Sequence, residues 1–158
     1  MRLATPCSTE YWVIPDQELT EKGLLIVTGS NLQAERYDRP LAYRLKGIIE
    51  RQAEEDGREF NVVVLGDLWF LNSEPLQQLP TISVGSPSIN AVAAYLMKRL
   101  PNALVVENTL MIQMDLHLED LRVSLWGTNQ NLTNNALDIF INRGYLEQFL
   151  DAALARRY

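Results

Sequence analysis

The chain is poor in cysteine and histidine, and this scarcity excludes several kinds of site. Cys7 is the single cysteine and His117 the single histidine among 158 residues. One cysteine excludes an intramolecular disulfide and a cysteine-based zinc site, and one histidine excludes a histidine-rich metal centre. We therefore assign no metal ligand, and the low cysteine content favours a reducing, cytoplasmic location.

Positive charge is also scarce. The 14 Lys and Arg residues stand against 20 Asp and Glu residues, which gives a net charge of -6. A surface of this sign repels a polyphosphate backbone unless cations are concentrated locally. The cations between Arg36 and Arg51 are interleaved with acidic residues, as on a solvated helix face. We therefore expect no nucleic acid partner.

Long apolar runs and familiar glycine-rich motifs are absent. No run approaches the roughly 18 apolar residues that span a bilayer, and the N-terminus lacks the pattern of a signal peptide. The chain has neither Gly-x-Gly-x-x-Gly nor Gly-Lys-Ser/Thr. No dinucleotide or NTP signature is therefore present, the cofactor stays unknown, and we expect no membrane association.

Four short apolar runs end at a glycine flanked by small polar residues. They occupy residues 24–30, 62–67, 82–86 and 123–128. Such repetition is typical of a parallel sheet in which each strand leads into a loop at the same edge. Open α/β sheets bind ligands at the carboxyl ends of their strands. The pattern therefore predicts a fold class and the place of a ligand site.

Apolar periodicity predicts helices between and after these strands. A stripe at helical spacing indicates a helix over residues 40–55 with Asp38 as its N-cap. A second helix is expected over residues 87–100 with Ser86 as N-cap, because proline is tolerated in a first helical turn. Two further helices are expected over residues 134–142, capped by Thr133, and over residues 145–156.

The remaining segments predict an edge hairpin and a long connection. Residues 103–106 are interpreted as a fourth parallel strand, and strict alternation over 110–118 followed by 121–126 predicts a hairpin that turns at 118–120. The connection over residues 66–80 contains Trp69, Phe70 and Leu71. Such large apolar groups predict a loop that folds back over the sheet or contacts a partner.

These elements together predict an α/β fold. We expect a three-layer sandwich with a mostly parallel, Rossmann-like or flavodoxin-like sheet and an edge hairpin. Residues 1–22 are irregular and are interpreted as an N-terminal arm, whereas residues 23–158 form a single α/β domain. A domain of this size buries a substantial core.

The loops after the strands supply the candidate ligand-binding residues. At the Gly85–Ser88 turn, backbone N–H groups and a helix N-terminus can face an anion. Hydroxyl and amide side chains between residues 127 and 135 suit sugars, nucleosides and water, although the same residues also form ordinary turns and caps. The candidates are Gly29, Ser30, Gly66, Gly85, Ser86, Ser88, Asn90, Gly127, Thr128 and Asn129.

Asp67 directly follows the second strand and is the candidate catalytic residue. A carboxylate there can act as a general base or stabilise a cationic transition state. Asp38 could reach the same crevice, although helix capping is its simpler role. Asp115 and His117 are expected on one face of a strand, where they form either an acid–base pair or, as their position near a turn favours, a solvated pair.

Two functional hypotheses follow from these patterns. The first is a domain that binds a nucleotide-like or sugar-like small molecule at the carboxyl edge of the sheet, with a glycosidic-bond hydrolase or transferase as its enzymatic version. The second is a non-catalytic interaction subunit that docks a partner, or a second copy in a homodimer, through its arm and its aromatic loop.

Overall fold

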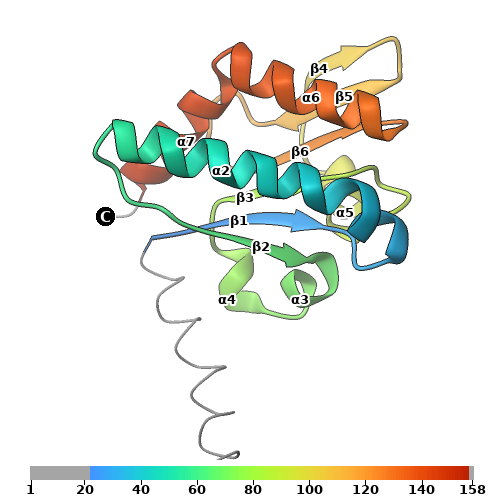
Figure 1. Ribbon diagram of the computed structural model, residues 1–158, viewed down its shortest axis with the longest axis horizontal. Coiled ribbons are helices and arrows are strands. Elements are labelled where there is room, and N and C mark those ends of the chain that lie inside the picture. Colours follow the sequence, from blue (N-terminus) through green and yellow to red (C-terminus); the bar gives the residue numbers. More distant parts are fainter. Residues whose placement is uncertain (1–21, 157–158) are drawn as a thin grey trace, which may run out of the picture.

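The computed structural model describes residues 22–156 and has an α/β fold, as the sequence predicts (Figure 1). A six-stranded sheet carries helices on both faces. Its strands are β1 (Gly23–Thr28), β2 (Asn61–Gly66), β3 (Thr81–Val84), β4 (Asn102–Val106), β5 (Leu110–Met114) and β6 (Arg122–Gly127). The predicted arm lies outside the described residues, except for Lys22.

Helical elements follow β1, β2, β3 and β6, whereas β4, β5 and β6 succeed one another without a helix between them. The helical elements are η1 (Ala34–Asp38), α2 (Arg39–Glu55), α3 (Asp67–Leu71), α4 (Glu74–Gln77), α5 (Ala91–Met97), α6 (Gln130–Asn142) and α7 (Tyr145–Ala155). The helices expected over residues 40–55 and 145–156 are thus confirmed as α2 and α7. The segment η1 is a single turn of π-helix that runs directly into α2.

The sheet is mostly parallel, with the strand order β2-β1-β3-β6-β5-β4. Strand β1 pairs in parallel with β2 and β3, and β3 pairs in parallel with β6. Strand β5 runs antiparallel to both β6 and β4. Every residue of β1 is buried, because helices cover both faces of a central parallel strand and leave no side for polar residues.

The prediction for the edge hairpin is only partly correct. The expected strand over 121–126 is β6, which lies inside the sheet beside β3 and is the fourth parallel strand. The segment 103–106, expected as that parallel strand, belongs instead to β4, which pairs antiparallel with β5 and forms the edge hairpin with it. Strand β5 ends at Met114 rather than at residue 118. The Asp115 carboxylate accepts backbone N–H groups from His117, Glu119 and Asp120, which closes a turn where the alternation suggested more strand.

Alternate side chains of β1 point into two separate cores. Leu24 and Ile26 pack beneath α2, α6 and α7, where Phe140 and Phe149 are fully buried. Leu25 and Val27 point to the other face, beneath α3, α4 and α5. The period of two along the strand thus divides one apolar run between the two layers of helices.

The connection over residues 66–80 is helical and not an open loop. It contains α3 and α4, and its aromatic residues divide by exposure. Phe70 is buried in the core beneath α5, whereas Trp69 is 44% exposed. The expectation of a segment that folds back over the sheet is therefore correct for Phe70.

Two helices begin at caps other than those predicted from the sequence. Helix α5 begins at Ala91 with Asn90 as its N-cap, so residues 87–89 form a turn and Ser86 is not the cap. Helix α6 begins at Gln130 with Asn129 as its N-cap instead of Thr133. Both asparagine side chains accept backbone N–H groups of their own helices, as N-caps do.

Candidate functional site

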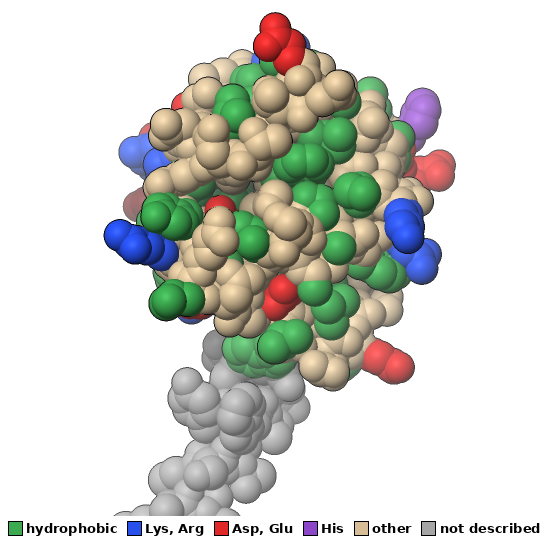
Figure 2. Space-filling model, turned by 90° about the vertical axis from the view of Figure 1, so that its right-hand side faces the viewer, with side chains coloured by type: hydrophobic (Ala, Val, Ile, Leu, Met, Phe, Trp, Pro, Cys, Tyr) green, Lys and Arg blue, Asp and Glu red, His purple; other side chains and the backbone are tan. Residues whose placement is uncertain are grey.

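Parallel pairing places the glycine loops at one edge of the sheet. Thr28 lies opposite Gly66 between β1 and β2, and Val84 lies opposite Leu125 between β3 and β6. Gly29, Gly66, Gly85 and Gly127 therefore follow or end their strands at the carboxyl edge. Figure 2 looks onto this edge, where hydrophobic and neutral polar atoms occupy most of the view and Lys and Arg side chains lie at its margins.

A cavity of about 290 Å³ opens at the carboxyl edge and is called here the rim cavity. Its volume is just below the range of about 300–1,000 Å³ that is usual for small-molecule sites. The walls come from η1, the β3–α5 loop and the start of α6. Of the residues that the sequence proposes, Ser86, Ser88, Gly127, Thr128 and Asn129 line the rim cavity.

Asp38 contributes a buried carboxylate to the rim cavity. The residue is only 3% exposed, and its Oδ2 atom has no hydrogen-bond partner within residues 22–156. Other buried polar atoms in this part of the chain lack partners too, but Oδ2 is the one that belongs to a residue of the cavity wall. Burial raises the pKa of Asp38 from 3.8 to about 6, because a carboxylate without partners loses its hydration.

The predicted capping role of Asp38 is wrong. Asp38 occupies the N-cap position of α2, but its backbone is already helical and its side chain makes no cap hydrogen bond. It is the last residue of the π-helical turn η1, and such turns are frequent at functional sites. Because η1 continues the helix through this position, the carboxylate points away from the first N–H groups of α2.

Gly85 leaves room for the Asp38 carboxylate. A Cβ atom at Gly85 would lie 2.5 Å from Asp38 Oδ2, and the backbone of Gly85 has φ +116°. Residues with a Cβ rarely adopt this conformation, so both the close approach and the backbone require glycine here. The end of β3 is thus shaped to accept the side chain of η1.

Asp67 is held by internal hydrogen bonds. Its carboxylate accepts hydrogen bonds from the Ser30 hydroxyl at 2.6 Å and from the backbone N–H of Ala91 at 2.8 Å. The residue is 5% exposed and is not part of the rim-cavity wall. Asp67 therefore joins the loop after β1, the start of α3 and the start of α5, which is the arrangement of a positioning residue.

Asn90 ties the ends of two strands to a helix. Its Nδ2 atom donates to Val27 O at 3.2 Å, Ser83 Oγ at 3.1 Å and Val84 O at 3.0 Å. Its Oδ1 atom accepts the N–H groups of Val92 and Ala93. Together with the bond from Ala91 to Asp67, these bonds use the first three N–H groups of α5, so the anion-binding helix end proposed from the sequence is filled by the chain's own side chains.

The other candidates have structural contacts at the same edge. Gly29, Ser30 and Gly66 are not part of the rim-cavity wall. Gly127 lets α6 approach β6, because a Cβ atom there would lie 2.3 Å from Leu132 Cβ and 2.6 Å from Thr133 N. Ser86 Oγ and Ser88 Oγ lie 2.9 Å apart and share a hydrogen bond at the cavity wall.

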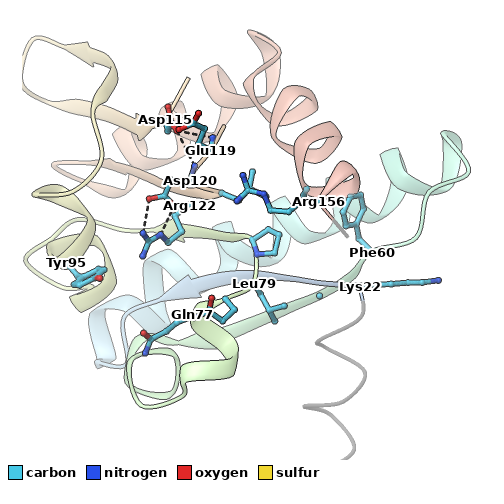
Figure 3. Close-up of a pocket in the computed structure, with 15 residues that line it drawn as sticks. Lys22, Phe60, Gln77, Leu79, Tyr95, Asp115, Glu119, Asp120, Arg122 and Arg156 are labelled. Carbon is cyan, nitrogen blue, oxygen red and sulfur yellow. Dashed lines mark hydrogen bonds and ion pairs between the residues drawn. The ribbon is translucent and has the colours of Figure 1, made fainter. Parts of the chain in front are cut away.

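A larger cavity of about 760 Å³ lies at the opposite, amino edge of the sheet (Figure 3). Its charged groups are engaged with neighbours. Arg122 binds both oxygens of Asp120 at 2.7 and 2.8 Å, and Arg156 donates to Leu118 O at 3.2 Å. Asp115 lies here with its pKa lowered, chiefly by the N–H groups of His117 and Asp120. This bonding is that of a solvated turn.

Comparison with known proteins yields no match: no family model, curated protein or solved structure is significantly similar to this chain. Within residues 22–156, no helix combines the length and hydrophobicity needed to cross a membrane. The same residues contain no cluster of three or more His, Cys, Asp or Glu that could hold a metal ion. The function must therefore be inferred from the geometry of the rim cavity.

Proposed function

We propose that the chain is a small-molecule-binding domain that takes a nucleotide-like or sugar-like ligand in the rim cavity. The observation that carries this proposal is the buried, unpartnered carboxylate oxygen of Asp38 on the cavity wall. Burying a charge without a partner is unfavourable, and strongly perturbed carboxylates cluster at functional sites. A ligand that donates a hydrogen bond to the Asp38 carboxylate would reduce this cost.

The strand order supports a flavodoxin-like version of the fold. The parallel strands follow the order β2-β1-β3-β6, so the chain moves from β1 to β2 on one side and then to β3 on the other. Doubly wound sheets of this kind bind ligands at the carboxyl ends beside that reversal. The rim cavity lies at this edge, between the turn after β1 and the loop after β3.

The enzymatic version of the proposal is a glycosidic-bond hydrolase or transferase. Such enzymes generally use two carboxylic acids in different protonation states. Asp38, whose pKa burial raises to about 6, is suited to exchange a proton near neutral pH. Asp67, the base proposed from the sequence, lies at the same edge and would act by positioning the loops, because both of its hydrogen-bonded contacts are internal.

Amide NMR titration tests the proposal directly. Nucleosides, nucleoside monophosphates and monosaccharides should shift resonances of the cavity wall, chiefly in residues 86–88 and 127–130. The Asp38→Asn variant should weaken this response, whereas Glu50→Gln should not, because Glu50 is an exposed carboxylate of α2 outside the cavity wall. If no compound of any of these classes shifts the wall resonances of the folded protein, the proposal is wrong.

Docking of a partner is a second candidate function. Leu32 and Leu68 are 83% and 59% exposed, and Ser30 bonds to Asp67 and to the Leu68 N–H, which brings their loops together. Exposed apolar groups that cluster in this way are typical of contact surfaces. Light scattering after size-exclusion chromatography tests self-association. A dimer that Leu68→Glu dissociates would favour this function, and a monomer at high concentration would exclude a homodimer.

A further inference from the structure

The wall of the rim cavity carries no cation. Apart from the Asp38 carboxylate, its polar side chains are hydroxyls and amides, contributed by Gln33, Tyr37, Ser86, Ser88, Thr128, Asn129, Gln130 and Thr133. Within the described residues, no Lys or Arg side chain belongs to the wall. A phosphate group carries about -1.5 to -2 charges at pH 7 and would lie in this cavity without a counter-charge.

The cations nearest in sequence to Asp38 contact other side chains and are not part of the wall. Arg39 donates to Glu35 at 2.9 Å and lies over the ring of Tyr43. Arg36 lies over the ring of Tyr37, 5.4 Å from its centroid. Tyr37 is the other titratable group of the wall, and the walls formed by the β3–α5 loop and α6 contribute none. Asp38 is therefore the dominant charge that a bound ligand meets.

The helix ends near the cavity are also poor anion sites. The N–H groups of Ala91, Val92 and Ala93 at the start of α5 are bonded to Asp67 and Asn90. At the start of α6, the Asn129 side chain accepts the Leu132 N–H, and Thr133 Oγ1 accepts the Gly127 N–H. Helix N-termini bind phosphate through such N–H groups; the first three at the start of α5 are taken by side chains, and at the start of α6 the Leu132 N–H is taken.

The geometry points to an uncharged, hydroxyl-bearing ligand, a nucleoside or a free sugar, that binds beside the Asp38 carboxylate, and it disfavours the phosphorylated form of the same compound. This inference rests on the proposed function and narrows its ligand class. Neutral hydroxyl and amide groups on the remaining wall can both donate to and accept from sugar hydroxyls. A phosphate would be repelled by the ionised carboxylate and would find no Lys or Arg side chain on the described wall.

Matched pairs of compounds test this selectivity. Adenosine, uridine and ribose are each compared with adenosine monophosphate, uridine monophosphate and ribose 5-phosphate at pH 7.5, by amide NMR titration of the full chain. We expect each neutral member to bind at least about tenfold more tightly than its phosphate, because bringing like charges together is strongly unfavourable. In Asp38→Asn this preference should shrink to about twofold, whereas it should persist in Glu50→Gln, which changes an exposed carboxylate of α2 outside the wall.

A pH series on the neutral member gives a second readout. Adenosine affinity should increase as the pH rises from 5 to 7.5, because ionised Asp38 is the stronger acceptor, and Asp38→Asn should remove this dependence. If the phosphates bind as tightly as or more tightly than their neutral partners at the cavity wall, the inference is wrong and the proposed function stands. If no member of any pair shifts the wall resonances, the inference and the proposed function are both wrong. Retained amide dispersion confirms that each variant is folded.

Discussion

At the scale of single residues, Asp38 combines an ordinary sequence context with an unusual environment. The carboxylate directly precedes a helix that contains an early proline, which is typical of an N-cap. In the structure it is buried against Gly85 and makes no cap bond. Such a group weakens the folded state whenever it is ionised, and the weakening depends on pH.

Replacing Asp38 by Asn should therefore stabilise the protein above pH 6. The folded-state pKa of about 6 exceeds the ordinary 3.8, so the folded protein binds the proton more tightly and its stability falls as the pH rises between these values. Asp38→Asn should gain about 2–3 kcal/mol at pH 8 relative to the natural chain and nothing near pH 3.5. Urea denaturation at both pH values measures the difference. A loss of stability at pH 8 would show that the carboxylate has a stabilising partner.

Asn90 should be among the least replaceable polar residues. It is 1% exposed and makes five hydrogen bonds through both ends of its amide. Asn90→Ala should cost about 3 kcal/mol, since it leaves buried carbonyl and N–H groups unsatisfied.

The Asn90→Asp variant separates capping from strand bridging. It keeps the acceptor for the N–H groups of α5 but sets a carboxylate against the carbonyl oxygens of Val27 and Val84. We expect Asp to destabilise the protein about as much as Ala in chemical denaturation. A variant as stable as the natural chain would mean that capping alone matters.

At the scale of elements, Asp67 joins three segments that are distant in sequence. Asp67→Ala removes the acceptor for Ser30 and for the Ala91 N–H and should cost about 3 kcal/mol. A double-mutant cycle with Ser30→Ala should show a coupling of about 1 kcal/mol, because these side chains share a buried bond. The exposed Asp138→Ala serves as control, and additive effects of Ser30 and Asp67 would contradict their direct interaction.

The elements that the sequence predicts well are those whose packing follows their own periodicity. Residues 24–28 form a strand because every side chain is apolar, and α2 and α7 each bury one stripe at helical spacing. The starts of α5 and α6 are harder to predict. Asn90 caps α5 while its side chain also bonds to Val27, which is distant in the sequence. The N-cap of α6 is Asn129, whose place depends on the path of the preceding loop. The local signals at Ser86 and Thr133 carry no information about those partners.

The candidate site likewise contains residues that the sequence predicts and one, Asp38, whose place in the wall it does not predict. Ser86, Ser88 and residues 127–129 line the rim cavity because they follow parallel strands, and the direction of those strands is visible in the glycine pattern. Asp38 becomes part of the wall only through the π-helical turn and the close approach of Gly85. A single extra residue in a helical turn leaves no mark in hydrophobic spacing, so the sequence favours the capping role instead.

At the scale of the whole molecule, the protection of backbone amides against hydrogen exchange should decrease from the centre of the sheet to the β4 edge. Strand β1 is buried on both faces and paired on both sides, whereas β4 is a five-residue edge strand with Val105 and Val106 more than a third exposed. Amide hydrogen exchange should be at least about 100-fold slower in β1 than in β4. Equal protection of β4 would indicate that another chain covers this edge in solution.

The position of the described chain ends has a practical consequence. Lys22 and Arg156 both border the larger cavity at the amino edge (Figure 3), whereas Asp38 lies at the carboxyl edge of the same sheet. A tether that leaves the described part of the chain at Arg156 therefore starts on the side opposite the rim cavity. Protein immobilised on a sensor chip through a tag after Tyr158 should keep the rim cavity facing the flowing solution.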